Sequence, residues 1–334
     1  MTRGFLLGKF MPPHAGHVQL WTMASALVDA LTILVCWLPD DPIPGPLRLQ
    51  WVKELAPNAR VIGHGGVVPQ APDESPDFWP VWREIVREAH PEPIDLLFAG
   101  ETYGAELARQ VGGRFVALGG RVMNADRGGL GGVSATAVRA DPWKHWRWLP
   151  APVRAFYGKT ICLHGVESTG KSVLAERLSE RFGTVAVAEY GRIHCEVHGT
   201  DCTRDDLLLI GRVQQAAIEA AKPWGRGLAI ADTDALMTAA WGEMMIGEVP
   251  PQLLEYPKAD LYLLLEPDVP WIDDGTRLYP GEDRDRFHVI AESVLSRAGV
   301  RFDRVGGDWE QRFEQACAAI DDWIRAIGWT LSNP

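Results

Sequence analysis

The sequence predicts an α/β protein made of two parallel-sheet domains, and three observations support this fold class. Short apolar runs alternate with helix-length amphipathic stretches along the whole chain, which is typical of parallel sheets covered by helices. The length of 334 residues fits two domains of about 100–200 residues each. Near the middle, Leu149-Pro150-Ala151-Pro152 closes a proline-containing stretch. We therefore place a domain boundary there, between residues 1–150 and 151–334.

Each half contributes its own series of predicted elements. In the first half we predict strands at residues 5–8, 32–37, 60–62, 96–99 and 114–117, and helices at 17–27, 47–56, 78–90 and 103–111. In the second half we predict strands at residues 160–164, 185–188, 228–231, 261–265 and 300–305, and helices at 171–182 and 235–245.

Composition and charge exclude several classes of protein. Apolar residues make up 46% of the chain and charged residues 23%, which is the balance of an ordinary soluble protein. A formal net charge of −11 disfavours general nucleic-acid binding, because phosphates require a basic surface. Five cysteines without C-x-x-C spacing indicate buried, reduced thiols. We see neither an apolar run of about 18 residues nor a signal peptide, so we expect a cytoplasmic protein without membrane insertion.

A phosphate-binding loop is the strongest signal in the second half. The run GVESTGKS at residues 165–172 matches G-x-x-x-x-G-K-[ST] between a predicted strand and a predicted helix. In such a loop, backbone N–H groups surround the β-phosphate, Lys171 reaches the β- and γ-oxygens, and Ser172 ligates Mg²⁺. This half therefore binds a nucleoside triphosphate. The residues assigned to the nucleotide are Gly165, Glu167, Ser168, Thr169, Gly170, Lys171 and Ser172.

Three acidic or basic clusters favour a small-molecule kinase. Glu189 follows the second predicted strand, where a carboxylate can accept the proton of an attacking hydroxyl, although a surface ion pair is the alternative. Asp232 and Asp234 follow the next strand, where an acid can position Mg²⁺ or bind ribose hydroxyls. One of these two aspartates can instead be a helix N-cap. Residues 268–286 read as a mobile loop whose Arg277 and Arg284 close over the triphosphate, or as a solvated charge run.

The first half carries a different phosphate signature. The run GKFMPPHAGH at residues 8–17 fits G-x-F-x-P-x-H-x-G-H, the signature of the HxGH nucleotidyltransferases. His14 and His17, near a helix start, can both donate to phosphate oxygens, and Gly16 lets the backbone approach the nucleotide. A metal pair or buried core histidines are the alternatives. In VSATAVR at 133–139, Ser134 can cap a helix and Arg139 can pair with the triphosphate. Gly8, Lys9, Phe10 and Thr136 complete this predicted site.

Aromatic residues near these motifs are candidates for stacking on the bases. Trp79 and Trp82 offer faces to a cationic ring, but packing against the sheet claims at least one of them, and we favour Trp79 slightly. Tyr103 lies in the turn at 101–104, where adenine or ribose of ATP can bind. In the kinase half the sequence does not rank the aromatic candidates, and we also assign Arg192 and Asp234 to the substrate. The aromatic candidates are Tyr190, Trp241 and Trp271.

Taken together, these motifs resemble the NadR family of bifunctional nicotinamide mononucleotide adenylyltransferases and ribosylnicotinamide kinases. The matching stretches follow the family order across nearly the whole chain. They are GKFMPPHAGH, FAGETYGAELA, GGVSATAVRADPWKHW, HGVESTGKS, EYGR, ADTDAL and DDGTR followed by DRF. Enteric members carry a helix-turn-helix repressor domain ahead of the adenylyltransferase, and this sequence lacks one. The resemblance therefore implies the two enzymatic activities without operator binding.

The resemblance implies a two-step synthesis of NAD with ATP and Mg²⁺ as cofactors. The second half would transfer the γ-phosphoryl group of ATP to the 5′-hydroxyl of ribosylnicotinamide. The first half would join the resulting nicotinamide mononucleotide to the AMP moiety of ATP. Both steps depend on positioning and on cations that neutralise phosphate oxygens. We expect no nucleic-acid partner, and the sequence leaves a homo-oligomer open.

Two other functions remain open from the sequence. HxGH motifs do not fix the acceptor, so an adenylyltransferase with another acceptor, fused to an unrelated small-molecule kinase, is one alternative. A nucleotide-sensing regulator with weak catalysis is the other. Nothing in the residues themselves establishes which aromatic side chain stacks on nicotinamide, or whether nicotinate is accepted.

Overall fold

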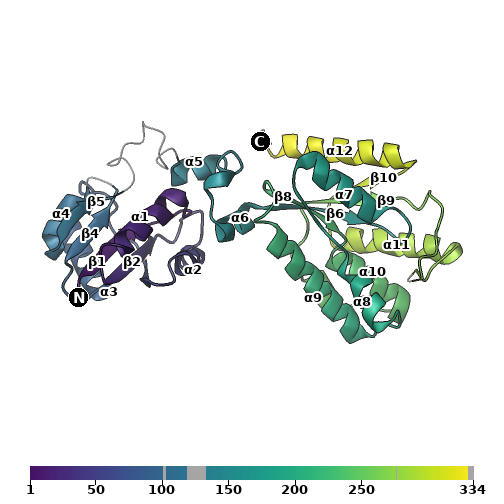
Figure 1. The fold of residues 1–334 in the computed structure, drawn as a ribbon, viewed down its shortest axis with the longest axis horizontal. Helices are drawn as coiled ribbons and strands as arrows, with labels where there is room; N and C mark the ends of the chain where they lie inside the picture. Colours follow the sequence, from purple (N-terminus) through teal and green to yellow (C-terminus); the bar gives the residue numbers. More distant parts are fainter. Residues whose placement is uncertain (101–102, 119–132, 276, 330–334) are drawn as a thin grey trace. The chain divides into compact units, whose positions relative to one another are not determined.

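The computed structural model of the chain describes residues 1–100, 103–118, 133–275 and 277–329. They form two compact units, Met1–Val153 and Arg154–Pro334, and helix α6 (Ala151–Tyr157) spans the division between them (Figure 1). Each unit is built on a five-stranded parallel sheet. The predicted fold class, two parallel-sheet α/β domains, is confirmed.

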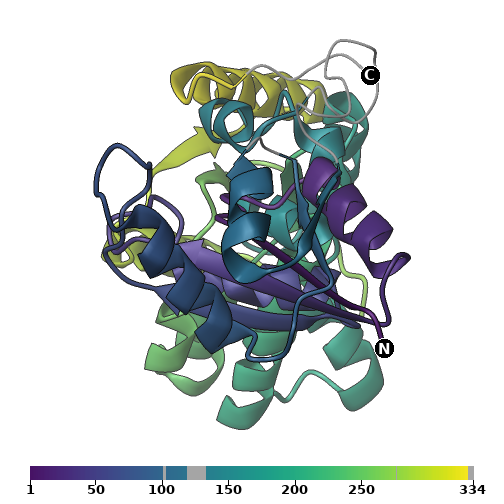
Figure 2. The same cartoon turned by 90° about the vertical axis from the view of Figure 1, so that its left-hand side faces the viewer.

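The first unit has the strand order β3-β2-β1-β4-β5, and all its pairs are parallel. Figure 2 turns this sheet toward the viewer. Its strands are β1 (Arg3–Gly8), β2 (Ala30–Trp37), β3 (Arg60–Gly65), β4 (Leu96–Ala99) and β5 (Arg114–Ala117). Its helices are α1 (Ala15–Ser25), α2 (Gly45–Leu55), α3 (Phe78–Ala89), α4 (Tyr103–Val111) and α5 (Ala135–Ala140), and a short 3₁₀ helix covers Trp146–Trp148.

Helices cover both faces of this sheet, because alternate strand residues point to opposite sides. Leu6 and Ile33 pack with α1 and α2, whereas Phe5 and Leu34 pack with α3 and α4. All four side chains are fully or almost fully buried. Burial on both faces explains why the central strand β2 is almost continuously apolar.

The second unit has the strand order β10-β9-β6-β8-β7, again with parallel pairs. Its strands are β6 (Lys159–His164), β7 (Val185–Val187), β8 (Leu228–Asp232), β9 (Leu261–Leu265) and β10 (Phe302–Val305). Its helices are α7 (Lys171–Phe182), α8 (Tyr190–His198), α9 (Arg204–Ala221), α10 (Ala235–Ile246), α11 (Glu282–Arg297) and α12 (Trp309–Ala326), with a 3₁₀ turn at Pro251–Leu254.

One face of the second sheet packs against α9, α10 and α11. Cys162 and Leu264 join the core of α10 and α11, and Ala231 packs with Ile218 of α9. Helices α7 and α12 contact each other on the opposite side (Figure 1). Strands β6, β7 and β8 are parallel neighbours, so the segments that follow them meet at one edge of the sheet. This edge is where ligands bind in open α/β sheets.

Most predicted elements are present with ends shifted by a few residues. Helix α1 begins at Ala15 rather than at residue 17, because His14 caps it. Strand β3 runs to Gly65 because it stays paired with β2 as far as Trp37. The larger error concerns residues 282–286. They begin helix α11, where acidic residues occupy the first turn, whereas the sequence suggested a loop.

Trp37 explains why glycines occur in and near β3. Built Cβ atoms at Gly45, Gly63 and Gly65 would lie 2.1, 2.6 and 2.3 Å from the Trp37 ring. These three positions therefore accept no side chain while the ring stays in place.

We expect Gly45→Ala to destabilise the first unit by about 1–3 kcal/mol, the usual effect of overpacking. Gly66→Ala is the matched control, since its Cβ would meet only a ring atom of His64 at 3.9 Å. Hydrogen exchange of the β1 and β2 amides measures opening of this unit alone. Equal protection in the two variants would contradict the packing argument.

Candidate active sites

The loop between β6 and α7 has the backbone shape that phosphate binding requires. Gly165, Ser168 and Gly170 have φ angles of +146°, +59° and +84°, so successive N–H groups can turn to the same side. A Cβ at Gly165 would lie 3.0 Å from the Leu265 carbonyl oxygen, and one at Gly170 would lie 2.5 Å from the Trp309 ring. Glycine is therefore required at both positions by the backbone and by space.

Two buried arginines hold this loop through its carbonyl groups. Arg284 Nε donates to Glu167 O over 3.2 Å, and its Nη1 donates to Val269 O over 2.7 Å. Arg312 donates to Thr169 O over 3.4 Å and pairs with the Asp268 carboxylate. Arg284 is 6% exposed and lies on α11. Arg284 therefore lies in a helix rather than in the mobile loop that the sequence suggested, and its Nη2 has no hydrogen-bond partner among the described residues, so its contact with phosphate stays a prediction.

The described residues of 268–281, which we call the strap, lie against the phosphate loop. The Glu167 carboxylate accepts the N–H groups of Leu278 and Tyr279 over 2.9 and 3.0 Å. Ser168 Oγ accepts from Ile272 N over 3.1 Å and from Arg277 Nη1 over 2.6 Å. The Glu167 side chain thus holds the strap rather than presenting a free carboxylate to a nucleotide.

Arg277 is the strap arginine that stays near the phosphate loop. Its Nε lies 3.0 Å from the Asp274 carboxylate, which Arg192 of α8 also contacts over 2.8 Å. The residue before Arg277 in the predicted motif, Thr276, lies outside the described residues. An ionic chain therefore links α8, the strap and the phosphate loop at Ser168.

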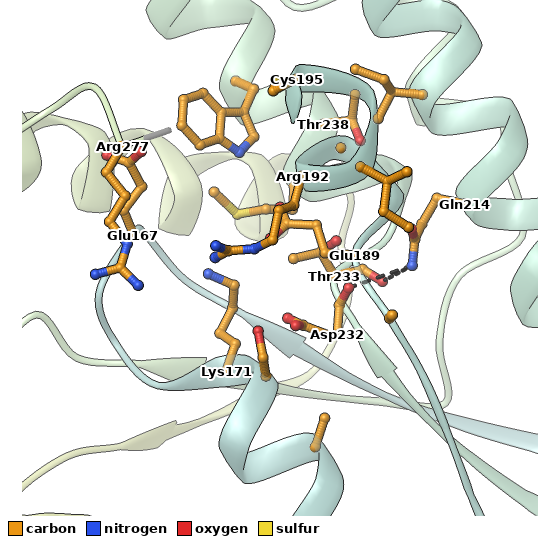
Figure 3. Close-up of a pocket in the computed structure, with 18 of the residues that line it drawn as sticks. Glu167, Lys171, Glu189, Arg192, Cys195, Gln214, Asp232, Thr233, Thr238 and Arg277 are labelled. Atoms are coloured by element: carbon orange, nitrogen blue, oxygen red, sulfur yellow. Dashed lines mark hydrogen bonds between the residues drawn. The ribbon is translucent and has the colours of Figure 1, made fainter. Parts of the chain in front are cut away.

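A cavity of about 590 Å³ opens above the phosphate loop. Figure 3 shows Lys171, Glu189, Arg192 and Asp232 converging in it from four different elements. Lys171 Nζ donates to the Val166 carbonyl over 3.0 Å. The cavity also has an apolar part, lined by Val187, Ile193, Leu207, Ile210, Met237 and Trp241. A charged end and an apolar end suit a phosphate donor and a nucleoside-like acceptor.

Glu189 has the properties of a proton acceptor. Burial raises the pKa of its carboxyl, the charges of Asp232 and Glu167 raise it further, and Lys171 and Arg192 oppose this shift. A carboxylate with a raised pKa takes up a proton more readily near neutral pH than an ordinary one does.

The same edge of the sheet suits a divalent cation. Asp232 is 2% exposed, and its Oδ1 has no hydrogen-bond partner among the described residues. Ser172 lies in the first turn of α7 and lines the same cavity. No group of three metal-ligating side chains exists in the described part of the chain. One carboxylate and one hydroxyl fit Mg²⁺, which usually completes its shell with water and substrate phosphates.

Several predicted substrate residues of the second unit lie elsewhere. The Asp234 carboxylate caps α10 through the N–H groups of Leu236 and Met237 and accepts from Tyr262 Oη over 2.5 Å. The structure thus gives it the helix-cap role, which the sequence left open, and it does not line the cavity. Tyr190 packs with the core of α9, and neither it nor Trp271 lines the cavity.

Trp241 does line the cavity, and the ring of Tyr279 lies beside the Trp241 indole. The ring centroids of Trp241 and Tyr279 are 5.7 Å apart, with an angle of 37° between the planes. Tyr279 is the strap residue whose N–H Glu167 accepts. The sequence analysis did not select it.

In the first unit the two signature histidines lie against each other. Their ring centroids are 3.9 Å apart. His14 Nδ1 accepts from the Gly16 N–H over 3.1 Å, which leaves the proton of the neutral ring on Nε2. Burial lowers the pKa of His14 to about 4 and, with the His14 charge, lowers the pKa of His17 well below its usual value. Both rings are therefore neutral at physiological pH, and each can donate one hydrogen bond.

Arg139 connects the two phosphate motifs of this unit. It donates to the Met11 carbonyl and, over 3.3 Å, to Thr136 Oγ1. Ser134 caps α5 by accepting from the Ala137 N–H over 3.1 Å. The chain thus brings residues 8–17 and 133–139 to one place, although they are far apart in sequence.

Asp41 and Arg48 support the signature loop, and the sequence analysis missed both. Arg48 is fully buried and donates to the carbonyls of Lys9 over 2.5 Å and Ile43 over 2.9 Å. Its Nη2 pairs with Asp41 over 2.6 Å, and Lys9 Nζ lies 3.7 Å from the same carboxylate. An arginine in the buried stripe of α2, beside Trp51 and other core residues, was the available signal.

Two predicted ligand residues of the first unit belong to its core. Phe10 is 3% exposed and packs edge-on against His17 and Trp21, so it supports the histidines from beneath. Trp82 is buried with α3 and donates from Nε1 to the Pro69 carbonyl over 2.9 Å. It is thus the tryptophan of the pair that packs in the core, as the sequence expected of at least one of them.

Trp79 and Tyr103 are more accessible than Trp82. Trp79 is half-buried beside the α3 core, and Tyr103 is 40% exposed at the start of α4. Residues 101–102 of the predicted turn lie outside the described part of the chain.

Comparison with known proteins places the whole chain beside one family. It is 28% identical to the trifunctional NAD biosynthesis/regulator protein NadR of Escherichia coli, over 93% of this chain and 81% of that protein. It is 26% identical to the protein of the same name from Salmonella typhimurium, over 97% and 84% of the two chains. The chain is thus similar to NadR proteins over nearly its whole length.

Solved structures and a domain family agree with this placement. A crystal structure of a NadR protein in complex with NR has a TM-score of 0.77 and 22% identity, covering 99% of this chain and 98% of that one. A second, with NAD and AMP-PNP, has a TM-score of 0.75 and 21% identity, covering 100% and 98%. At this identity they establish a shared fold. Residues 160–312, which include the phosphate loop, match the AAA domain family.

The helices of the described ranges contain no segment long and apolar enough to cross a membrane.

We expect Glu167→Ala to loosen the strap, because the N–H groups of Leu278 and Tyr279 lose their acceptors. Limited proteolysis in the absence of nucleotide should cut within 270–280 faster in this variant than in the parent. Glu180→Ala, on an exposed face of α7, is the control. Equal cleavage rates in both variants would show that the carboxylate does not hold the strap.

We also expect His14 to remain neutral in the free protein until about pH 4. Its ring C–H resonance, assigned by comparison with His14→Asn, should titrate at that value in NMR spectra. Because the unfolded chain binds this proton near pH 6.5, the first unit should lose stability as the pH falls between these values. A midpoint near 6.5 would contradict a desolvated ring.

Proposed function

We propose that the chain is a bifunctional enzyme of NAD synthesis that uses ATP twice. The second unit phosphorylates ribosylnicotinamide to nicotinamide mononucleotide, and the first unit adenylylates this mononucleotide to NAD and pyrophosphate. The observation that carries the proposal is the convergence of Lys171, Glu189 and Asp232 beside an apolar pocket. The similarity to NadR proteins of NAD biosynthesis, and to NadR structures in complex with NR or with NAD and AMP-PNP, supports it.

In the kinase unit, each charged group has a separate task. Glu189 accepts the proton of the 5′-hydroxyl as the oxygen attacks the γ-phosphorus and ADP leaves. Lys171 and the backbone N–H groups of residues 165–172 hold the β- and γ-oxygens, and Arg277 adds positive charge from the strap side. Asp232 and Ser172 would hold Mg²⁺, which neutralises phosphate charge when it is bound.

The same cavity offers an aromatic side chain on which the nicotinamide ring of the acceptor can stack. Trp241 lines its apolar part, and a cationic nicotinamide ring is attracted to the indole face. Arg192, anchored by Asp274, lies where it can contact ribose or phosphate oxygens.

In the adenylyltransferase unit, the nucleophile is already an anion and needs no general base. A phosphate oxygen of the mononucleotide attacks the α-phosphorus of ATP, and the bond to pyrophosphate breaks. His14 Nε2–H, His17, Lys9 and Arg139 supply donors for the phosphate oxygens. Neutral rings at a helix start still donate hydrogen bonds, and the N–H groups of α1 add to them. Trp79 is the candidate for stacking on nicotinamide here.

We expect two substitutions to separate the activities. Removing one preorganised donor costs about 10²–10³ in rate, so Lys171→Ala should suppress mononucleotide formation while adenylylation of supplied mononucleotide continues near the parental rate. His17→Ala should do the reverse. Product analysis by mass spectrometry checks both, and mixing the variants should restore NAD formation. Equal loss of both reactions in either folded variant would contradict two separate sites.

As the pH falls, the kinase reaction should lose activity at a higher pH than it would with a general base of ordinary pKa. The pKa of Glu189 is raised, and the base works only when it is deprotonated, so the rate falls as the pH drops through that raised value. The pH profile of kcat reports this group in the substrate complex. In Glu189→Gln the residual rate should lack this acid limb. An identical limb in the variant would assign it to another group.

A further inference from the structure

One buried amide touches both segments that carry the kinase carboxylates. Gln214 on α9 is 1% exposed. Its Oε1 accepts the N–H of Tyr190, the residue after Glu189, over 2.8 Å. Its Nε2 donates to the carbonyls of Asp232 and Thr233 over 3.4 and 3.3 Å (Figure 3).

The segment that Gln214 holds at the end of β8 is strained. Thr233 has a φ of +73°, which is unfavourable for a β-branched residue and costs on the order of 1–3 kcal/mol. Such a conformation persists only where the surroundings fix it. Here the Thr233 N–H donates to Leu163 O over 3.1 Å, the next residue caps α10, and the Gln214 amide binds the carbonyls on both sides.

Packing alone does not explain an amide at this position. The buried face of α9 is otherwise largely apolar and includes Leu207, Ile210 and Ile218. A glutamine offers one acceptor and two donors, and these match the N–H and the two carbonyls of the facing segments. Burying such a group is favourable only when its hydrogen bonds are made.

We propose that Gln214 is a positioning residue for phosphoryl transfer, which fixes the spacing of the Glu189 and Asp232 carboxylates. The inference rests on the proposed kinase function. Tyr190 begins α8 directly after Glu189, and the Asp232 carbonyl belongs to the residue that would hold the cation. Gln214 lines the cavity without offering its amide to a ligand, because both ends are already bound to backbone.

The test compares Gln214 with its neighbour in the same full-length chain. Gln214→Met keeps the length of the side chain and removes all three hydrogen bonds. Gln214→Glu keeps the acceptor for Tyr190 and, when ionised, removes the donors. Gln215→Met is the control, because Gln215 is also buried but binds only Glu219 on its own helix over 3.1 Å and does not line the cavity.

We expect Gln214→Met to lower the kinase kcat by about 10–100-fold, the usual effect of losing a supporting group. KM for ribosylnicotinamide should change by less than about threefold, because the acceptor contacts remain. Gln214→Glu should fall between parent and Gln214→Met. Hydrogen-exchange protection of the β6 and β9 amides should stay at the parental level in all variants, which checks that the second unit is folded.

A second readout does not depend on the acceptor. The affinity of Mn²⁺, used as a probe for Mg²⁺, is measured on the complex with a non-hydrolysable ATP analogue. We expect this affinity to fall by about tenfold or more in Gln214→Met and to stay unchanged in Gln215→Met.

Different results identify different errors. If kcat and Mn²⁺ affinity in Gln214→Met match those of Gln215→Met, the positioning role is wrong. If kcat falls together with the protection of the β6 and β9 amides, Gln214 is merely structural, and the same comparison on the isosteric Gln214→Glu decides a case in which the methionine variant fails to fold. If the parent makes no mononucleotide, the proposed kinase function is wrong, while the Mn²⁺ comparison still judges Gln214.

Discussion

The second unit depends on backbone held in the left-handed region at the edge of its sheet. Gly165, Ser168 and Gly170 carry the phosphate loop, and Thr233 turns the chain at the end of β8. Such conformations are unfavourable by themselves, and here fixed hydrogen bonds offset that cost. Arg284 and Arg312 bind carbonyls of the phosphate loop, and other groups bind the turn at Thr233. Both arginines are buried while they donate to backbone oxygens, and Arg312 also pairs with the Asp268 carboxylate.

Both units place the groups that can donate hydrogen bonds to phosphate in the same kind of position. In each, a parallel strand ends, the chain turns, and a helix begins with its N–H groups facing the ligand: α1 after β1 in the first unit and α7 after β6 in the second. The side chains differ with the chemistry. In the proposed function, neutral histidines and Arg139 would serve a reaction at the α-phosphorus with an anionic nucleophile, whereas Lys171 and Glu189 would serve a hydroxyl nucleophile that must lose a proton. Only the second reaction needs a base with a raised pKa.

The sequence predicts the parts of the sites that backbone geometry and local motifs determine. The strand-turn-helix order of both motifs, the elements around them and the residues of the phosphate loop follow from apolar periodicity and glycine placement. The sequence pattern misleads where a run of charged residues can form a helix instead of a loop. Arg284 looks like part of a flexible charged loop, but the acidic residues before it begin a helix and bury it. For Asp234 the helix-cap alternative was visible, and the structure assigns it to the cap.

Residues that act through backbone contacts are the ones that the sequence does not reveal. Arg48 and Gln214 touch carbonyls of segments far away in sequence, so no local motif contains them. Both, however, interrupt an otherwise buried helix stripe with a polar side chain, α2 for Arg48 and α9 for Gln214. A polar residue at a core position of a helix beside a phosphate motif is therefore a useful signal for a supporting role.

The central claim is that one chain carries out two successive reactions, in which the product of the second unit is the substrate of the first. Isotope tracing tests it most directly, with the parent protein, unlabelled ribosylnicotinamide, Mg²⁺ and ATP labelled separately at the α- or the γ-phosphorus. The account predicts that NAD acquires its nicotinamide-side phosphate from the γ-position and its adenylyl phosphate from the α-position, with pyrophosphate released. NAD without the γ-label, or labelled mononucleotide that never becomes NAD, would contradict it.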